Sequence, residues 1–170
     1  MLTSTHAVRE WLNRHELQRA LIDHDLMVHM QSGNHLGISL SLFTGDELPI
    51  QFGVVDGYFD VSCTSIKSLR GFPHTINGSF ACNHSGIQSL SGIDKIIKRI
   101  SGRIICSHPT HMLGLLLIDG VTEITTSGWP QDSGPWDKLD QIMNNHLTTH
   151  DIVAAQDELI DAGYIQQAGL

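Results

Sequence analysis

The clearest pattern of apolar and polar positions is a phrase that recurs along the middle of the chain. In residues 57–61, 78–82 and 102–106, a glycine is followed by apolar side chains two and four positions later. The second copy begins 21 residues after the first, and the third begins 24 residues after the second. This alternation predicts three short strands with these inward side chains: Phe59, Val61, Phe80, Cys82, Ile104 and Cys106. A period in the low twenties is typical of a solenoid, in which each turn supplies one strand and one return loop.

The return segments repeat as well. Residues 66–71 and 87–92 both carry an apolar residue, then Ser-Leu, then a glycine at the same spacing. Ile76 and Ile100 stand two residues before the next glycine and are predicted to close each turn. The side of the core opposite the strand is predicted to be filled by four residues: Ile66, Leu69, Ile87 and Leu90. Stacking of like residues in successive turns predicts one buried column: Phe59, Phe80 and Ile104.

Outside these copies the strand signals are weaker. Residues 25–30 predict a strand, and Ile38, Leu40 and Leu42 alternate with serines as a half-buried strand does. Residues 31–34 predict a turn, and residues 48–53 a connecting loop. After residue 106 the pattern degrades, and one more strand with its edge is predicted from four residues: Leu115, Leu117, Val121 and Ile124.

Helical periodicity occurs only near the two ends of the chain. Near the N-terminus it places Val8, Trp11, Leu12 and His15 on one face, with Ser4 or Thr5 as the cap. Near the C-terminus it predicts two helices after a break at residues 128–135, the second of them ending at Gly163. The first has an apolar face of Trp136, Leu139, Ile142, Met143 and Leu147, and the second has Ile152, Ala155, Leu159 and Ala162.

The predicted fold class is α+β: a short, single-sided β-solenoid with helices covering both ends. Residues 1–170 are expected to form a single domain. Within it, residues 1–22 are the N-terminal capping helix, 24–127 the strand-rich repeats and 135–163 the C-terminal helical cap. Terminal helices are expected because the last strands of a solenoid expose unpaired edges.

Composition narrows the class of function. The apolar content of 41% and charged content of 16% are those of a globular chain. A formal net charge of −8 disfavours direct binding of nucleic acid and favours a basic protein surface as partner. Three cysteines, an odd number, favour reduced thiols and a cytoplasmic location. No signal peptide is visible, and the longest apolar run, residues 113–118, is far too short to cross a membrane.

The repeat also carries a resemblance. The pattern Gly-x-Phe-x-Cys, followed by Ile/Leu-x-Ser-Leu-x-Gly, resembles the short, irregular leucine-rich-repeat-like coils of proteins from large tailed bacteriophages. Residues 48–57 are similar to the entry segment of that group, and residues 151–163 to the helix that often closes such chains. The resemblance covers about residues 23–163 and implies the architecture. It implies no active site, and it points to a partner from a bacterial host.

Histidines and cysteines are the most unusual candidates for chemistry. Cys63, His84 and His108 each stand six residues after a repeat glycine and are predicted to share one column, with His111 nearby. Thiolates and imidazoles can bind zinc. The favoured interpretation is that the column bonds the turn backbone, so we expect no metal and no other cofactor. Cys82 and Cys106, with a histidine as base, could act as nucleophiles, but their inward positions favour a role as small core residues.

Carboxylates and tryptophans offer candidate contact residues. Asp157, Glu158 and Asp161 lie on the last predicted helix, where an acidic face could attract a basic partner. On the strand face, the side chains that alternate away from the core include four candidates for binding: Tyr58, Asp60, Ser79 and Arg103. Trp129 and Trp136 flank the break and are expected to anchor the C-terminal helices rather than form an exposed hot spot.

These observations favour a non-catalytic protein–protein interaction module over an enzyme. We expect a phage-encoded acidic binder, a monomer or small homo-oligomer, that blocks a host protein complex such as a defence system. The alternative is a self-assembling structural or virion-associated protein that pairs through coil edges or residues 113–118. A hydrolase is the least favoured class, and it would require His108, His111 and a cysteine or aspartate to converge in one pocket.

Overall fold

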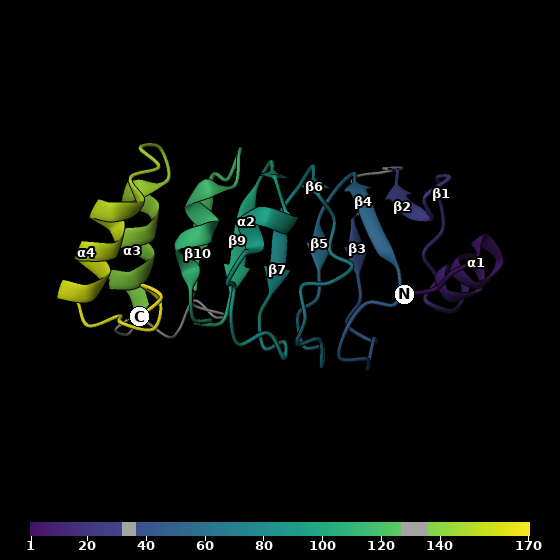
Figure 1. Cartoon of the computed structure of the whole chain (residues 1–170), viewed down its shortest axis with the longest axis horizontal. Coiled ribbons are helices and arrows are strands. Elements are labelled where there is room, and N and C mark those ends of the chain that lie inside the picture. The colour runs from purple at the N-terminus through teal and green to yellow at the C-terminus, as the bar shows by residue number, and fades with distance from the viewer. Residues whose placement is uncertain (32–36, 127–135) are drawn as a thin grey trace.

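The chain folds into a mixed α/β structure with two small sheets between terminal helices. The computed structural model describes residues 1–31, 37–126 and 136–170. Along the longest axis, helix α1 (Thr5–Arg14) lies at one end, and helices α3 (Trp136–His146) and α4 (Ile152–Asp161) lie at the other (Figure 1). The strands lie between them, so both predicted helical caps are present.

Each of the two sheets has five strands. One sheet has the order β1 (Ala20–Ile22), β2 (Met27–Met30), β4 (Gln51–Val55), β6 (Thr75–Ile76) and β8 (Arg99–Ile100). The other has the order β10 (Glu123–Thr125), β9 (Arg103–Cys106), β7 (Phe80–Cys82), β5 (Phe59–Asp60) and β3 (Ile38–Ser39). All neighbouring strands are parallel except β1 and β2.

The prediction of one strand per repeat is wrong, because each repeat supplies one strand to each sheet. Ile76 and Ile100 do more than close a turn. They belong to strands β6 and β8 of the first sheet, in which Val55, Ile76 and Ile100 are in register. Residues 51–55 form β4 of this sheet, so the loop predicted over residues 48–53 is also wrong at its second half.

The glycine between the two strands of a repeat is required by close stacking of the turns. A Cβ atom on Gly78 would lie 2.5 Å from the carbonyl carbon of Gly57, and one on Gly102 would lie 2.9 Å from that of Gly78. Of the three corner glycines, Gly57, Gly78 and Gly102, only Gly57 has a positive φ, 123°. Two of the three corner glycines are therefore needed for space rather than for backbone conformation.

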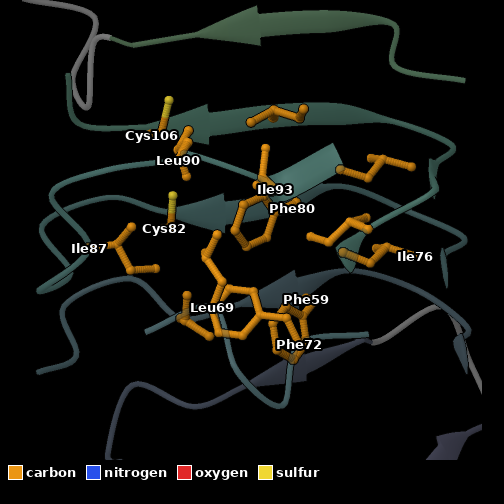
Figure 2. Close-up of a cluster of buried hydrophobic side chains, with 14 of the residues drawn as sticks. Phe59, Leu69, Phe72, Ile76, Phe80, Cys82, Ile87, Leu90, Ile93 and Cys106 are labelled. Atoms are coloured by element: carbon orange, nitrogen blue, oxygen red, sulfur yellow. The ribbon is translucent and has the colours of Figure 1, made fainter. Parts of the chain in front are cut away.

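The predicted column of inward side chains is confirmed. Phe59 is in register with Phe80, and Phe80 with Ile104, and all three are fully buried. The rings of Phe59 and Phe80 stack with centroids 6.2 Å apart, and Phe72 packs edge-on against both (Figure 2). The other inward positions predicted in the repeats are also buried: Val61, Ile66, Leu69, Cys82, Ile87, Leu90 and Cys106. One continuous core runs through the repeats.

Three other sequence-based expectations need correction. Leu42 does not share a buried face with Ile38 and Leu40, because β3 ends at Ser39 and the Leu42 side chain is 89% exposed. Leu115 and Leu117 belong to a 3-10 helix, η1 (Met112–Leu117), rather than to a strand. Ile124 does lie in a strand, β10. The turn predicted at residues 31–34 lies, apart from residue 31, outside the described residues.

Helix α1 is shorter than the predicted cap of residues 1–22. Ser4 caps its start by accepting a hydrogen bond from the Ala7 amide at 3.2 Å. At its end the Leu17 amide bonds the Leu12 carbonyl at 2.9 Å, and Glu16 adopts a left-handed φ of 55°. This is the Schellman arrangement with glutamate in place of the usual glycine, so the sequence carries no obvious stop signal. Residues 20–22 then form β1 and pair with β2.

Helix α3 covers the edge of the second sheet. The Asn144 side chain accepts a hydrogen bond from the Ile124 amide and donates one to the Ile124 carbonyl, at 2.8 and 2.7 Å. Asp140 accepts hydrogen bonds from both the amide and the hydroxyl of Thr126. The backbone groups that β10 would leave unpaired at an open edge are thus satisfied by the cap.

Candidate functional site

The charge of the molecule is divided very unevenly along the chain. Residues 1–103, here the N-terminal segment, contain nine Asp or Glu and nine Lys or Arg residues. Residues 104–170, here the C-terminal segment, contain nine Asp or Glu residues and only one cation, Lys138. The formal net charge of −8 therefore belongs entirely to the C-terminal segment.

Helix α4 presents two of the exposed acidic groups of this segment on one face. Asp157 and Asp161 are exposed, and no hydrogen bond or ion pair of either carboxylate is present among the described residues. Val153 stands one turn before Asp157 on the same face and is 69% exposed. The sequence pattern predicted the two aspartates but not Val153. Val153 stands four residues before Asp157, a spacing that places both side chains on the same face of a helix. We call Val153, Asp157 and Asp161 the acidic face of α4.

Glu158, the third acid predicted on this helix, has a different environment. Its carboxylate lies 3.0 Å from Nε2 of His146 and 3.8 Å from Nζ of Lys138, both on α3. It joins α4 to α3 and is half-buried. Glu158 thus differs from Asp157 and Asp161, because a binding partner would have to displace its contacts with His146 and Lys138.

The four candidates on the strand face are largely engaged within the protein. Asp60 accepts a hydrogen bond from the Ser62 amide at 2.8 Å, and Ser79 accepts one from the Arg103 amide at 3.2 Å. Arg103 also lies 3.7 Å from the Glu123 carboxylate. Tyr58 is half-buried beside the start of β5. In contrast to Asp157 and Asp161 on α4, the charged side chains Asp60 and Arg103 of this face each have a partner within the protein.

The residues predicted to form one column, Cys63, His84 and His108, share an unusual backbone conformation. All three residues have a positive φ, of 59°, 51° and 43°. The Cys63 amide donates to the Asn83 carbonyl, and the His84 amide donates to the Ser107 hydroxyl. Each residue therefore adopts the left-handed conformation two or three positions after a strand of the second sheet. Over the described ranges, no group of three or more His, Cys, Asp or Glu side chains is placed to hold a metal ion.

Cys82 and Cys106 are in register in β7 and β9 and are buried, which confirms their predicted place in the core. The hydrogen bond with Cys82, together with burial, raises the pKa of the Cys106 thiol well above its usual value. A thiol held protonated in this way is a poor nucleophile.

The histidines expected to converge in a hydrolase contact different groups. His108 stacks on the Trp136 ring, with ring centroids 3.6 Å apart. His111 instead lies with Nδ1 3.1 Å from the Ser89 hydroxyl and 2.9 Å from that of Thr110. The first contact joins the last repeat to α3, and the second joins two neighbouring return segments.

The contact between His108 and Trp136 anchors the C-terminal helices, as the sequence predicted for Trp136; Trp129 lies outside the described residues. Burial lowers the pKa of His108, and nearby His84 lowers it further, while Asp140 opposes the shift. Burial also raises the pKa of Asp140, against the two hydrogen bonds from Thr126. Both groups at this junction are therefore shifted towards their neutral forms.

The apolar segment considered for self-assembly is mostly inside the protein. Leu115, Leu116 and Ile118 are buried, and only Leu117 offers a large exposed side chain, at 51%. Together with the covered edge of β10, this leaves little apolar surface for pairing between copies here. Self-assembly stays a prediction that a measurement of mass in solution tests.

The chain has no match among protein-family models, among curated proteins or among solved structures. Nor does any helix within the described ranges have the length and apolar character needed to span a membrane.

Proposed function

We propose that this protein is a non-catalytic interaction module whose C-terminal cap docks on a basic surface of another protein. The two sheets would form a short leucine-rich-repeat-like solenoid that serves as a rigid support, with α3 and α4 at its end. The single observation that carries the proposal is the acidic face of α4, on which Asp157 and Asp161 are exposed and make no ion pair with any described residue.

Unpaired carboxylates suit this role for two reasons. They need not break an internal ion pair before they bind lysine or arginine, so their attraction to a partner is not offset by a lost contact. The excess of negative charge over residues 104–170 also raises the rate of encounter with a basic surface. Val153 adds exposed apolar area beside the charges, and apolar burial contributes affinity that salt does not screen.

The resemblance to phage coils supports a bacterial host protein as the partner. A host complex that binds nucleic acid has the required basic surface. An acidic cap bound to that surface would prevent the nucleic acid from binding. The proposed mechanism is therefore steric and electrostatic blockade of a host complex, such as one used in defence.

The experiment is affinity capture from host lysate at moderate salt with three proteins: the native chain, Asp157→Lys/Asp161→Lys, and the control Glu10→Lys/Asp25→Lys. Both variants change the net charge by the same amount, and all four substituted residues are exposed. We expect the native chain and the control to capture the same specific partner, and the α4 variant to lose it. Equal capture by all three, or no specific partner, would count against the proposal.

A further inference from the structure

We propose that a basic hollow on the return-loop side of the repeats binds a small phosphate-bearing compound. The hollow has a volume of about 600 Å³ and lies between residues 67–71 and helix α2 (Ile93–Ile96). Binding sites for small molecules have volumes of this order. It shares no residue with the acidic face of α4, so it stands independently of the function proposed above.

The hollow exists because two consecutive repeats differ in length. Ile76 follows Gly71 by five residues, whereas Ile100 follows the equivalent Gly92 by eight. The longer return segment contains α2, which has no counterpart in the shorter one. Lys95 and Ile96 of α2 form one wall, and the shorter segment forms another.

The lining is cationic although the chain is acidic. Lys67, Arg70 and Lys95 line the hollow, and no Asp or Glu of the described ranges does. The whole chain contains only ten Lys and Arg residues, so three of them meet at this one place. A ligand with several negative charges is favoured there over a neutral or cationic one.

These cations are available to a ligand. Lys67 pairs with Asp46 at 3.1 Å and Arg70 with Glu47 at 3.4 Å, but all four side chains are at least 45% exposed. Ion pairs this exposed contribute little and exchange readily. Lys95 has no ion pair with any described residue, so its charge has no internal competitor.

Hydroxyl groups add donors to the lining. The Ser68 hydroxyl oxygen accepts a hydrogen bond from the Arg70 amide at 3.2 Å, which leaves its O–H proton to donate outward. Ser91 lies exposed at the same hollow. By contrast, the amide nitrogen of Gln51 is already committed to the carbonyls of Phe52 and Phe72. Cations and hydroxyl donors without carboxylates suit the oxygens of a phosphate group.

The size and the surroundings favour a small compound over a polymer. A single phosphate would leave most of the hollow empty, so the ligand class is a compound of several heavy groups with at least one phosphate. A nucleic-acid strand is disfavoured because the C-terminal segment carries a formal charge of −8 and would repel its extended backbone.

The test is a titration of the full chain with pyrophosphate at constant ionic strength, followed by amide shifts in NMR spectra. We expect saturable shifts at residues 67–71 and 93–96. Arg70→Gln/Lys95→Gln should weaken binding by about tenfold or more, because it removes two charge-assisted contacts. Lys98→Gln/Arg99→Gln is the matched control: it removes the same charge from neighbouring exposed residues that do not line the hollow, and should change affinity by about twofold at most.

Three results would overturn the proposal: no saturable shifts at the hollow, equal weakening by the two variants, or equally tight binding of citrate. The last would show a general preference for anions rather than a phosphate site. Asp157→Lys/Asp161→Lys should bind pyrophosphate within about twofold of the native chain, because those residues lie outside the hollow. Failure of this site would thus be distinguished from failure of the acidic face of α4.

Discussion

The N-terminal and C-terminal segments both contribute buried side chains to one apolar core, but their charged residues are arranged in opposite ways. In the N-terminal segment, ion pairs such as Lys67–Asp46 and Arg70–Glu47 join residues 21 and 23 positions apart, which is the spacing of the repeat. In the C-terminal segment, acids outnumber cations nine to one, so most of them cannot be paired. Charged residues in the stacked turns can therefore pair with each other, whereas the acids of the C-terminal segment have almost no cation of their own segment to pair with.

The largest effect is expected from opening a cavity in each segment. Phe80 of β7 and Leu159 of α4 are both fully buried. Phe80→Ala should lower the free energy of unfolding by about 3–5 kcal/mol, and Leu159→Ala by about 2–5 kcal/mol. Urea unfolding followed by circular dichroism measures both losses.

The same experiment shows whether the segments unfold as one unit. Because the core is continuous, we expect each variant to move a single transition. Leu117→Ala, at a 51% exposed position, is the control and should change stability by less than about 0.5 kcal/mol. An unchanged midpoint for Phe80→Ala would contradict the buried column, and two separate transitions would contradict the continuous core.

A smaller contrast is expected between two glycines. Gly78→Ala forces a methyl group to within 2.5 Å of the Gly57 backbone, where nothing can move aside without separating the turns, so a loss of about 1–3 kcal/mol is expected. Gly163 has a φ of 87°, but a Cβ atom added there would have no neighbour within 4 Å, so Gly163→Ala meets only backbone strain of about 1 kcal/mol. Thermal unfolding measures both losses of stability. A larger loss for Gly163→Ala than for Gly78→Ala would contradict this expectation.

The smallest effect concerns two histidines that pack on tryptophans, one in each segment. The ring centroid of His15 lies 4.4 Å from that of Trp11, and the ring centroid of His108 lies 3.6 Å from that of Trp136. Burial lowers the pKa of both, so each takes up a proton more readily when the chain is unfolded. Their contribution to stability is present at neutral pH and falls as the pH drops below about 6.5.

The pH effect can be assigned by substitution. We expect the midpoint temperature of thermal unfolding to decrease when the pH is lowered from about 7.5 to about 5.5. His108→Asn should reduce that fall, since asparagine tolerates the left-handed backbone at this position. His15→Gln should reduce it through the N-terminal segment alone. If neither variant alters the dependence on pH, other groups control it.

Much of the repeat core could be predicted from the sequence, because alternation around a fixed glycine places each inward side chain without further information. The predictions failed where the deciding contact was remote. Gln51–Val55 becomes a strand because Met30 and Thr75, far away in the chain, supply its neighbours. The end of α1 was missed because Glu16 takes the position usually held by glycine.

For the candidate site, the sequence indicated acids on the last helix but not which of them are free. Asp157 and Glu158 are neighbours in the chain, yet only Glu158 faces His146 and Lys138 on α3. The basic hollow could not be predicted either. Lys67 and Lys95 are 28 residues apart, and only the stacking of a longer repeat on a shorter one places them together.

By itself, the sequence determined the period, the buried column and the presence of helices at both ends, since these depend on local alternation and helical spacing. Three features were decided only by the tertiary structure. Each repeat contributes a strand to each of two sheets, α3 covers the edge of β10, and certain charged side chains remain unpaired. The physical reason is that a side chain's partner in stacked turns lies about one repeat away, and only the register of the backbones fixes which side chain that is.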